Sequence, residues 1–218
     1  MNKNIVYLIC LMVLLFVGVT GCGPQDETRT LPYTRYVESY DGARVPVPDH
    51  PKRILALSSA SDTILLGLVE PDRLVGINTL STYEEYSLEA KRAKLVKPVM
   101  SSYPLEKIIA LDPDLVIAPD YTSADVIEGL RHMGIPTVVV PTGTTVESVI
   151  KNVTDVAHIV GEDEKGQFYE QKIRRELAEA KRLGASISPA ERKRVCSLCH
   201  PWMGTRAPVV FLMICVNI

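Results

Sequence analysis

The sequence predicts an α/β fold in which a parallel sheet is followed by a long helix. Short apolar runs rich in Val, Ile and Leu alternate with amphipathic segments through the middle of the chain. This alternation is typical of buried parallel strands linked by crossover helices. A charged segment with helical period follows the last apolar run. The composition is that of a globular chain, with 46% hydrophobic and 23% charged residues among 218.

The charge and the cysteines exclude two classes of protein. The chain has 24 Lys and Arg against 26 Asp and Glu, a net charge of −2. It lacks the basic excess that neutralises phosphates, so we expect no nucleic-acid partner. Its five cysteines do not form the dense, even framework of a small disulfide-stapled scaffold.

The N-terminus predicts export. Lys3 precedes an apolar run from Ile5 to Val19, and residues 1–21 are therefore predicted to be a signal peptide. Val19-Thr20-Gly21-Cys22 resembles the lipobox of bacterial lipoproteins, which predicts that Cys22 is lipidated and that residues 22–35 are a polar tether. A plain signal peptide followed by an incidental cysteine is the alternative. In either case the rest of the chain is expected outside the cytoplasm, and with lipidation it is anchored to the membrane.

The elements of the exported part follow in order. Residues 36–46 predict a hairpin, because Asp41-Gly42 suits the positive φ angles of a tight turn. Four short continuous apolar runs predict strands that are buried on both faces. These strands are Arg53–Leu57, Leu74–Ile77, Leu115–Ala118 and Thr137–Val140.

Amphipathic segments between these strands predict helices at Ser61–Leu68, Glu84–Lys91, Pro104–Leu111 and Ala124–Met133. The last helix has Ser123 as a plausible N-cap and Gly134 as a stop. The alternating order implies right-handed crossovers and a mostly parallel sheet.

Two further helices are predicted at Thr145–Val160 and Asp163–Leu183. The second is long and charged, and it could be either a terminal surface helix or a stiff connector between two lobes. We therefore divide this part into an α/β lobe at residues 36–150 and a helical segment at residues 151–185.

Several segments together resemble one family. They are Val45-Pro46-Val47-Pro48, Pro51 to Leu57, Leu105 to Ala118 and Gly134-Ile135-Pro136. They resemble the substrate-binding proteins of ABC importers for iron-siderophores, haem and cobalamin. The resemblance implies a Rossmann-like first lobe, a second lobe, and a rigid interlobe helix at Asp163–Leu183. It also implies a metal chelate held in the cleft, an ABC permease and its ATPase as partners, no resident cofactor and no catalysis.

Ligands of open α/β sheets bind beyond the carboxyl ends of the strands. The loops expected there are rich in hydroxyls and tyrosine rings, which can bond and cover a flat organic ligand. The predicted ligand-binding residues are Ser59, Ser102, Tyr103, Tyr121 and Thr122. Each of these five residues could instead be a turn residue or a helix cap. Ser102, and Ser61 in the same loop as Ser59, are the main candidates for caps. No cluster with metal-ligand spacing occurs between Asp26 and Val195, and no nucleophile–base set suggests an enzyme.

Permease docking is the second role that the resemblance assigns to a residue. The family presents a glutamate on the first helix of each lobe to arginines of the permease. The matching stretch here is Ser61-Asp62-Thr63, which has no glutamate. Asp62 is the nearest substitute, and a helix N-terminal anion is its alternative role.

The C-terminal tail departs from the family pattern. Residues 186–195 read as the start of a second lobe, but only 23 residues follow Val195. Cys196, Cys199 and His200 form a C-x-x-C-H pattern, so an exported c-type haem electron carrier is an alternative function. We favour a frameshift at residues 196–218, because a shifted reading of Trp202-Met203-Gly204 gives Asp-Gly, as in the second lobe of the family. The second lobe is then missing.

Overall fold

The computed structural model describes residues 35–186 and the backbone of two short strands at residues 194–197 and 214–217. The predicted signal peptide, Cys22 and the tether up to residue 34 lie outside the described residues. So do Cys199 and His200. Within the described part, no helix is both long and apolar enough to cross a bilayer.

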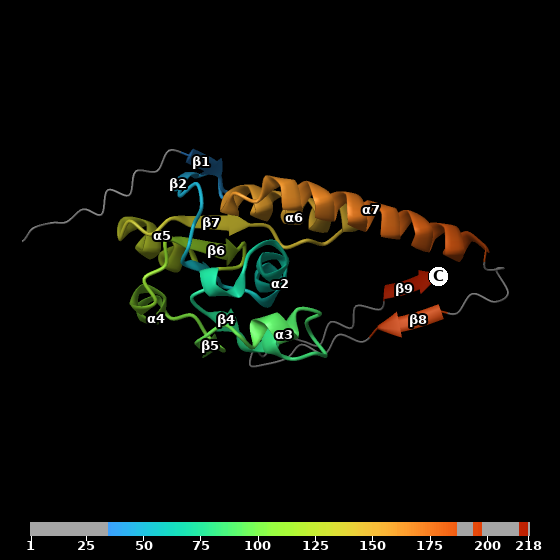
Figure 1. The fold of residues 1–218 in the computed structure, drawn as a ribbon, viewed down its shortest axis with the longest axis horizontal. Coiled ribbons are helices and arrows are strands. Elements are labelled where there is room, and N and C mark those ends of the chain that lie inside the picture. The colour runs from blue at the N-terminus through green and yellow to red at the C-terminus, as the bar shows by residue number, and fades with distance from the viewer. Residues whose placement is uncertain (1–34, 187–193, 198–213, 218) are drawn as a thin grey trace, which may run out of the picture. The chain divides into compact units, whose positions relative to one another are not determined.

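Parallel strands form the centre of the molecule (Figure 1). They are β3 (Ile54–Ala56), β4 (Ile77–Asn78), β5 (Val99–Met100), β6 (Leu115–Pro119) and β7 (Thr137–Val140). β6 lies between β3 and β7, and β4 pairs with β5. A parallel bridge between Ile54 and Leu74 joins the two groups, giving the order β5-β4-β3-β6-β7. The predicted parallel sheet is confirmed, although β5 was not predicted and β4 is shorter than expected.

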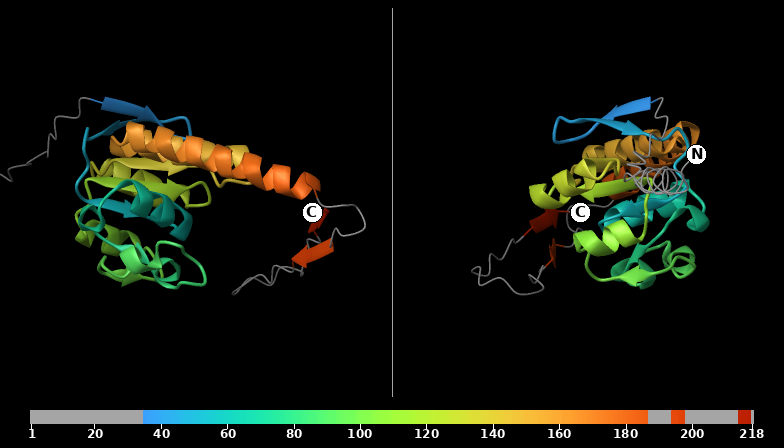
Figure 2. Two further views of the ribbon diagram at one scale, coloured as in Figure 1. Left: turned by 45° about the vertical axis from the view of Figure 1, so that its right-hand side comes forward. Right: turned by 90° about the vertical axis from the view of Figure 1, so that its left-hand side faces the viewer.

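Both faces of the sheet are covered, because successive strand residues point to opposite sides. Ile54 and Ala56 pack with α2 (Ser59–Leu68) and α6 (Val146–Val160). Leu55 and Leu57 pack on the other face with α4 (Leu105–Ala110) and α5 (Ala124–His132). The result is a helix–sheet–helix arrangement (Figure 2). Each large apolar side chain buried in this way contributes about 1.5–3 kcal/mol.

A hairpin borders the β7 edge of the sheet. Its strands are β1 (Arg35–Glu38) and β2 (Arg44–Val47), and Gly42 adopts the positive φ of 83° that the predicted turn requires. The backbone N–H of Tyr40 donates to the carbonyl of Val139 at 3.0 Å. The hydroxyl of Ser39 accepts from the N–H of Val139 at 2.8 Å. The predicted hairpin is confirmed and is fastened to the sheet.

α6 and α7 (Asp163–Ser186) follow the sheet. α6 contributes Ile150, Val156 and Ala157 to the buried core, so it belongs to the lobe, and the predicted boundary at residue 150 falls inside it. The start of α7 packs on α6, where Gly166 lies against Ala157 so closely that an added Cβ would come within 2.5 Å of the alanine methyl. From residue 171 onward every α7 side chain is exposed or half-buried. The helix continues away from the sheet (Figure 2).

One predicted helix is wrong. Residues 84–89 form turns, and only Ala90–Ala93 are helical, as α3. The apolar residues Tyr86 and Leu88 in this segment are two positions apart and are 72% and 99% exposed, so they form no buried helical face. The Ser87 hydroxyl accepts from the N–H of Glu89 at 3.2 Å, and such local bonds compete with helix formation.

The remaining short elements include two 3-10 turns, η1 (Pro71–Arg73) and η2 (Thr79–Thr82). β8 (Arg194–Ser197) and β9 (Ile214–Asn217) pair antiparallel with each other, and Cys196 lies opposite Cys215 in their register. The other residues of the predicted second-lobe start and tail lie outside the described residues.

Candidate functional site

The chain reverses its direction of travel across the sheet between β3 and β6. From β3 it moves outward through α2 to β4 and then to β5, and it returns through α4 to β6 on the other side of β3. In open α/β sheets, the crevice beyond the strand tips at such a reversal is the usual ligand site. The loops that border it begin at Ser58, after β3, and at Asp120, after β6.

The structure brings all five predicted ligand-binding residues to the carboxyl-end loops of the sheet. Ser59 follows β3, and Tyr121 and Thr122 follow β6, so these three flank the reversal. Ser102 and Tyr103 follow the edge strand β5. The ring of Tyr121 is 73% exposed, whereas Tyr103 is half-buried. All five residues therefore lie at the carboxyl-end edge of the sheet, where the sequence predicted them.

The cap alternatives for the serines are not observed. The N-cap of α2 is Ser58, whose hydroxyl accepts from the N–H of Ser61 at 3.2 Å. The N-cap position of α4 is Pro104, so Ser102 caps no helix. Ser59 is the first residue of α2, and its carbonyl accepts from the hydroxyl of Thr63 at 3.0 Å. Ser102 is therefore an exposed loop residue with its hydroxyl available.

Within the described residues, the buried hydroxyl of Tyr103 makes no hydrogen bond of good geometry, although the side chain of Asn78 lies close enough to oppose the rise of its pKa. Its ring packs against the cluster that contains Leu55, Met100 and Ile108. Burial raises the pKa of the phenol well above its usual range, and the nearby carboxylate of Asp62 and phenol of Tyr121 add to this effect. The hydroxyl therefore stays protonated and can donate a hydrogen bond.

Asp62 lies inside the protein. Its side chain is 0% exposed, and its Oδ2 accepts from the N–H of Asn78 and from the hydroxyl of Ser81, both at 2.8 Å. Desolvation raises the pKa of this carboxyl to about 7, and the two hydrogen bonds only partly oppose that rise. This burial contradicts the predicted docking role, because a carboxylate enclosed in this way cannot reach arginines of another protein.

Asp120 joins two of the strand-tip loops. Its carboxylate accepts from the N–H of Thr142 at 3.1 Å and from the Thr142 hydroxyl at 2.6 Å. These bonds lower the pKa of Asp120, so the group is ionised near neutral pH. The loop after β6, which carries Tyr121, is thereby tied to the loop after β7. The sequence analysis did not identify this link, since Asp120 and Thr142 are 22 residues apart.

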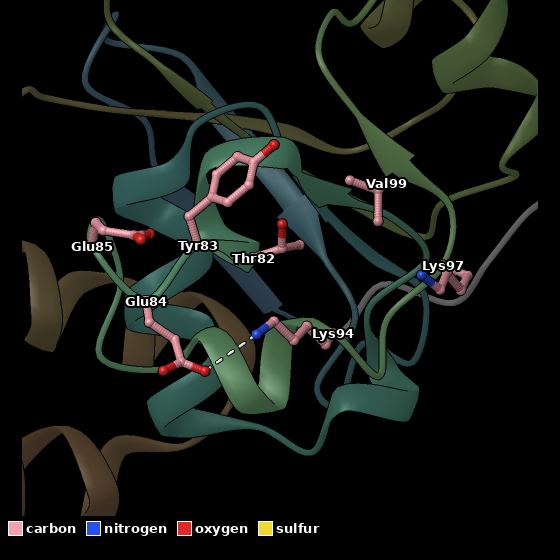
Figure 3. A pocket seen from close by; sticks show the side chains of 7 residues that line it. All are labelled: Thr82, Tyr83, Glu84, Glu85, Lys94, Lys97 and Val99. Carbon is pink, nitrogen blue, oxygen red and sulfur yellow. Dashed lines mark hydrogen bonds and ion pairs between the residues drawn. The ribbon is translucent and has the colours of Figure 1, made fainter.

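A cavity of about 460 Å³ lies at the β5 edge of the sheet (Figure 3). Its lining comes from η2 with the turn after it, and from the segment that leads into β5. The residues are Thr82, Tyr83, Glu84, Glu85, Lys94, Lys97 and Val99. Lys94 pairs with Glu84 at 3.2 Å, as the dashed line in Figure 3 shows. None of the five predicted residues lines this cavity.

A second cavity, of about 610 Å³, lies at the opposite edge, between the hairpin, β7 and α6. Tyr36, Tyr40 and His158 contribute rings to its wall. Within the described residues, no group of three or more His, Cys, Asp or Glu side chains is arranged to hold a metal ion.

Comparisons with known proteins agree with this architecture. The model of a family described as periplasmic binding protein matches residues 54–203. An uncharacterized ABC transporter substrate-binding lipoprotein of Bacillus subtilis, YvrC, is 27% identical over 84% of this chain and 60% of its own length. The iron(3+)-hydroxamate-binding protein YxeB of the same organism is 30% identical over 74% of this chain and 47% of its own length.

The fold also matches solved structures. A periplasmic solute binding protein from Veillonella parvula superposes with a TM-score of 0.59 at 22% identity, covering 71% of this chain and 49% of that one. The chain thus spans about half the length of the relatives that it matches. The family model covers most of the chain, including the whole sheet from β3 to β7. The chain therefore belongs to the periplasmic binding protein family.

Proposed function

We propose that this protein is the solute-binding component of an ABC importer and that it captures a metal chelate outside the cytoplasmic membrane. The observation that carries the proposal is the strand-tip surface at the reversal between β3 and β6, which presents hydroxyls and phenols. Phenol faces can cover the flat organic shell of a chelate, and hydroxyls can bond to its polar rim. The relationship to YvrC and YxeB supports the same role.

The ligand-binding residues in this proposal are Ser59, Ser102, Tyr103, Tyr121 and Thr122. Tyr121 is the most exposed ring among them, and the buried hydroxyl of Tyr103 makes no well-formed hydrogen bond within the described part of the chain. α7 is proposed as the connector to a second lobe, because beyond Arg174, which pairs with Glu147 of α6 at 3.0 Å, its described side chains are exposed or half-buried. An ABC permease and its ATPase are the proposed partners.

Ligand binding can be tested with the purified full-length protein. Equilibrium dialysis against a ferric hydroxamate siderophore, haem and cobalamin should show saturable retention of one of them. Tyr121→Ala should weaken that binding about five- to thirtyfold, the usual effect of removing an aromatic contact. Tyr86→Ala is the matched control, because Tyr86 is equally exposed but is not among the five proposed ligand-binding residues. Retention of none of the three chelates would contradict the proposal.

The proposed lipid anchor has its own test. Cells supplied with labelled palmitate should label the wild-type protein and the Cys10→Ser variant but not the Cys22→Ser variant. Cys10 is the appropriate control because it lies within the predicted signal peptide. Equal labelling of both variants would show that Cys22 is not the acylated residue.

The c-type haem carrier is the less favoured function. The family model runs through residue 203, so it includes Cys196, Cys199 and His200 in its match. A haem absorbance band that survives denaturation of the protein, after co-expression with the attachment machinery, would reverse this preference.

A further inference from the structure

Asp62 connects two elements that are separate in the chain. It lies in the first turn of α2, and its two hydrogen-bond donors, Asn78 and Ser81, belong to the end of β4 and to η2. Both bonds are 2.8 Å long and converge on one carboxylate oxygen. The carboxylate thus holds the segment that leaves β4 against the start of α2.

The segment that leaves β4 depends on this bond for its shape. Asn78 holds η2 through its side-chain oxygen, which accepts from the N–H of Leu80 at 2.9 Å. The hydroxyl of Thr82 closes the turn by donating to the carbonyl of Thr79 at 2.7 Å. The turn delivers Thr82 and Tyr83 to the wall of the 460 Å³ cavity. Asp62 does not line the cavity itself.

The second oxygen of Asp62 is buried, and no described residue forms a hydrogen bond with it. Tyr103, after β5, is the titratable group that its charge affects, and Tyr121 in turn lies close to Tyr103. Within the described residues, no lysine, arginine or histidine forms a hydrogen bond or ion pair with Asp62. Leaving an oxygen of a buried carboxylate unpaired is costly, so such a group needs a reason to be there.

We propose that Asp62 is a positioning residue that fixes the segment from Asn78 to Tyr83, and thereby the cavity wall at the β5 edge. Only the role of this cavity wall in ligand binding rests on the proposed function. The fixing itself is a property of the protein alone. Removing the carboxylate leaves two buried donors without an acceptor, which frees the segment locally.

The experiment is amide hydrogen exchange of the full-length protein at one pH. Asp62→Ala should speed exchange at Asn78, Leu80 and Tyr83 at least about tenfold, with little change in β6 and β7. Asp62→Asn should keep slow exchange, because its amide oxygen can still accept both hydrogen bonds. Asp125→Asn, an exposed first-turn aspartate of α5, is the control and should behave as wild type.

Two results would overturn the proposal. One is unchanged exchange from Asn78 to Tyr83 in a folded Asp62→Ala protein. The other is equal acceleration throughout the sheet, which would indicate global destabilisation. If Asp62→Ala does not fold, Ser81→Ala serves instead and should speed exchange in the same segment severalfold, and unchanged exchange in that variant would equally count against the proposal. If no chelate binds to the wild type, the proposed function fails while the exchange result still stands.

Discussion

Asp41 and Asp62 are two aspartates in the same lobe that respond oppositely to their surroundings. Asp41, in the hairpin turn, bonds to Arg131 at 2.6 and 3.3 Å, and this guanidinium lowers the carboxyl pKa to about 2. Asp62, below the β4 tip, is bonded only by neutral donors, and burial raises its pKa to about 7. The contrast shows that an arginine outweighs partial burial, whereas two neutral hydrogen bonds do not outweigh complete burial.

The two aspartates also connect different elements of the lobe. Arg131, near the end of α5, donates to Asp41, to the hydroxyl of Ser39 and to the carbonyl of Thr137, so it ties the hairpin to the sheet edge. Asp62 ties α2 to η2. Lowering the pH should therefore weaken the stabilisation that the contact between Asp41 and Arg131 provides, whereas raising the pH should destabilise the protein by ionising Asp62.

The largest expected effect is the pH dependence that Asp62 imposes on stability. The folded protein keeps this proton up to about pH 7, whereas the unfolded chain releases it near the ordinary value of 3.8. Raising the pH between these values therefore favours unfolding, by roughly 2–4 kcal/mol in total. Urea denaturation of the wild type and of Asp62→Asn between pH 4 and 8 measures the difference. Equal slopes for the two proteins would refute the assignment.

Removing the cation of the other pair should have the next largest effect. Arg131→Ala leaves Asp41 without its counter-ion and removes the bonds to Ser39 and Thr137. We expect a loss of about 2–3 kcal/mol in the free energy of unfolding at pH 7, near the lower end for a partly buried pair. Arg182→Ala removes a solvent-screened, exposed pair with Glu179 and should leave the free energy of unfolding nearly unchanged. A similar loss of unfolding free energy in both variants would show that the Asp41–Arg131 pair stabilises the protein no more than an exposed pair does.

The smallest effect should appear in acid. The unfolded chain protonates Asp41 near pH 3.8 and the folded protein near pH 2, so the contribution is complete above about pH 4 and disappears as the pH falls toward 2. The pair is partly exposed, which limits this contribution to about 1 kcal/mol. Asp41→Asn should flatten the acid limb of the stability curve between pH 4 and 2. An unchanged acid limb would show that protonation of other carboxyl groups causes the loss of stability between pH 4 and 2.

Sequence reasoning succeeded where neighbouring residues decide the structure. The strand at residues 115–119 is a continuous apolar run, and Gly134 has the φ of 73° expected of a helix stop. It failed at Glu84–Lys91, where turns replace most of the predicted helix and the side chains of Tyr86 and Leu88 are exposed. The family resemblance also assigned Asp62 to permease docking, which requires an exposed carboxylate, whereas this side chain is buried. Nothing in the local pattern indicated that Ser81 would reach back to it.

The sequence alone determined the α/β class, the order of most strands and helices, and the loops that carry hydroxyls and phenols, but not β5 or the turns at residues 84–89. Those features follow from hydrophobic period and from turn residues, which act over a few positions. The tertiary structure decided which strands are neighbours, which serine caps α2 and which aspartate is buried. These depend on contacts between residues far apart in the chain, such as Asp62 with Ser81 or Asp120 with Thr142. The burial of a polar side chain such as Asp62 depends on the assembled lobe, so the residues next to it in the sequence do not indicate it.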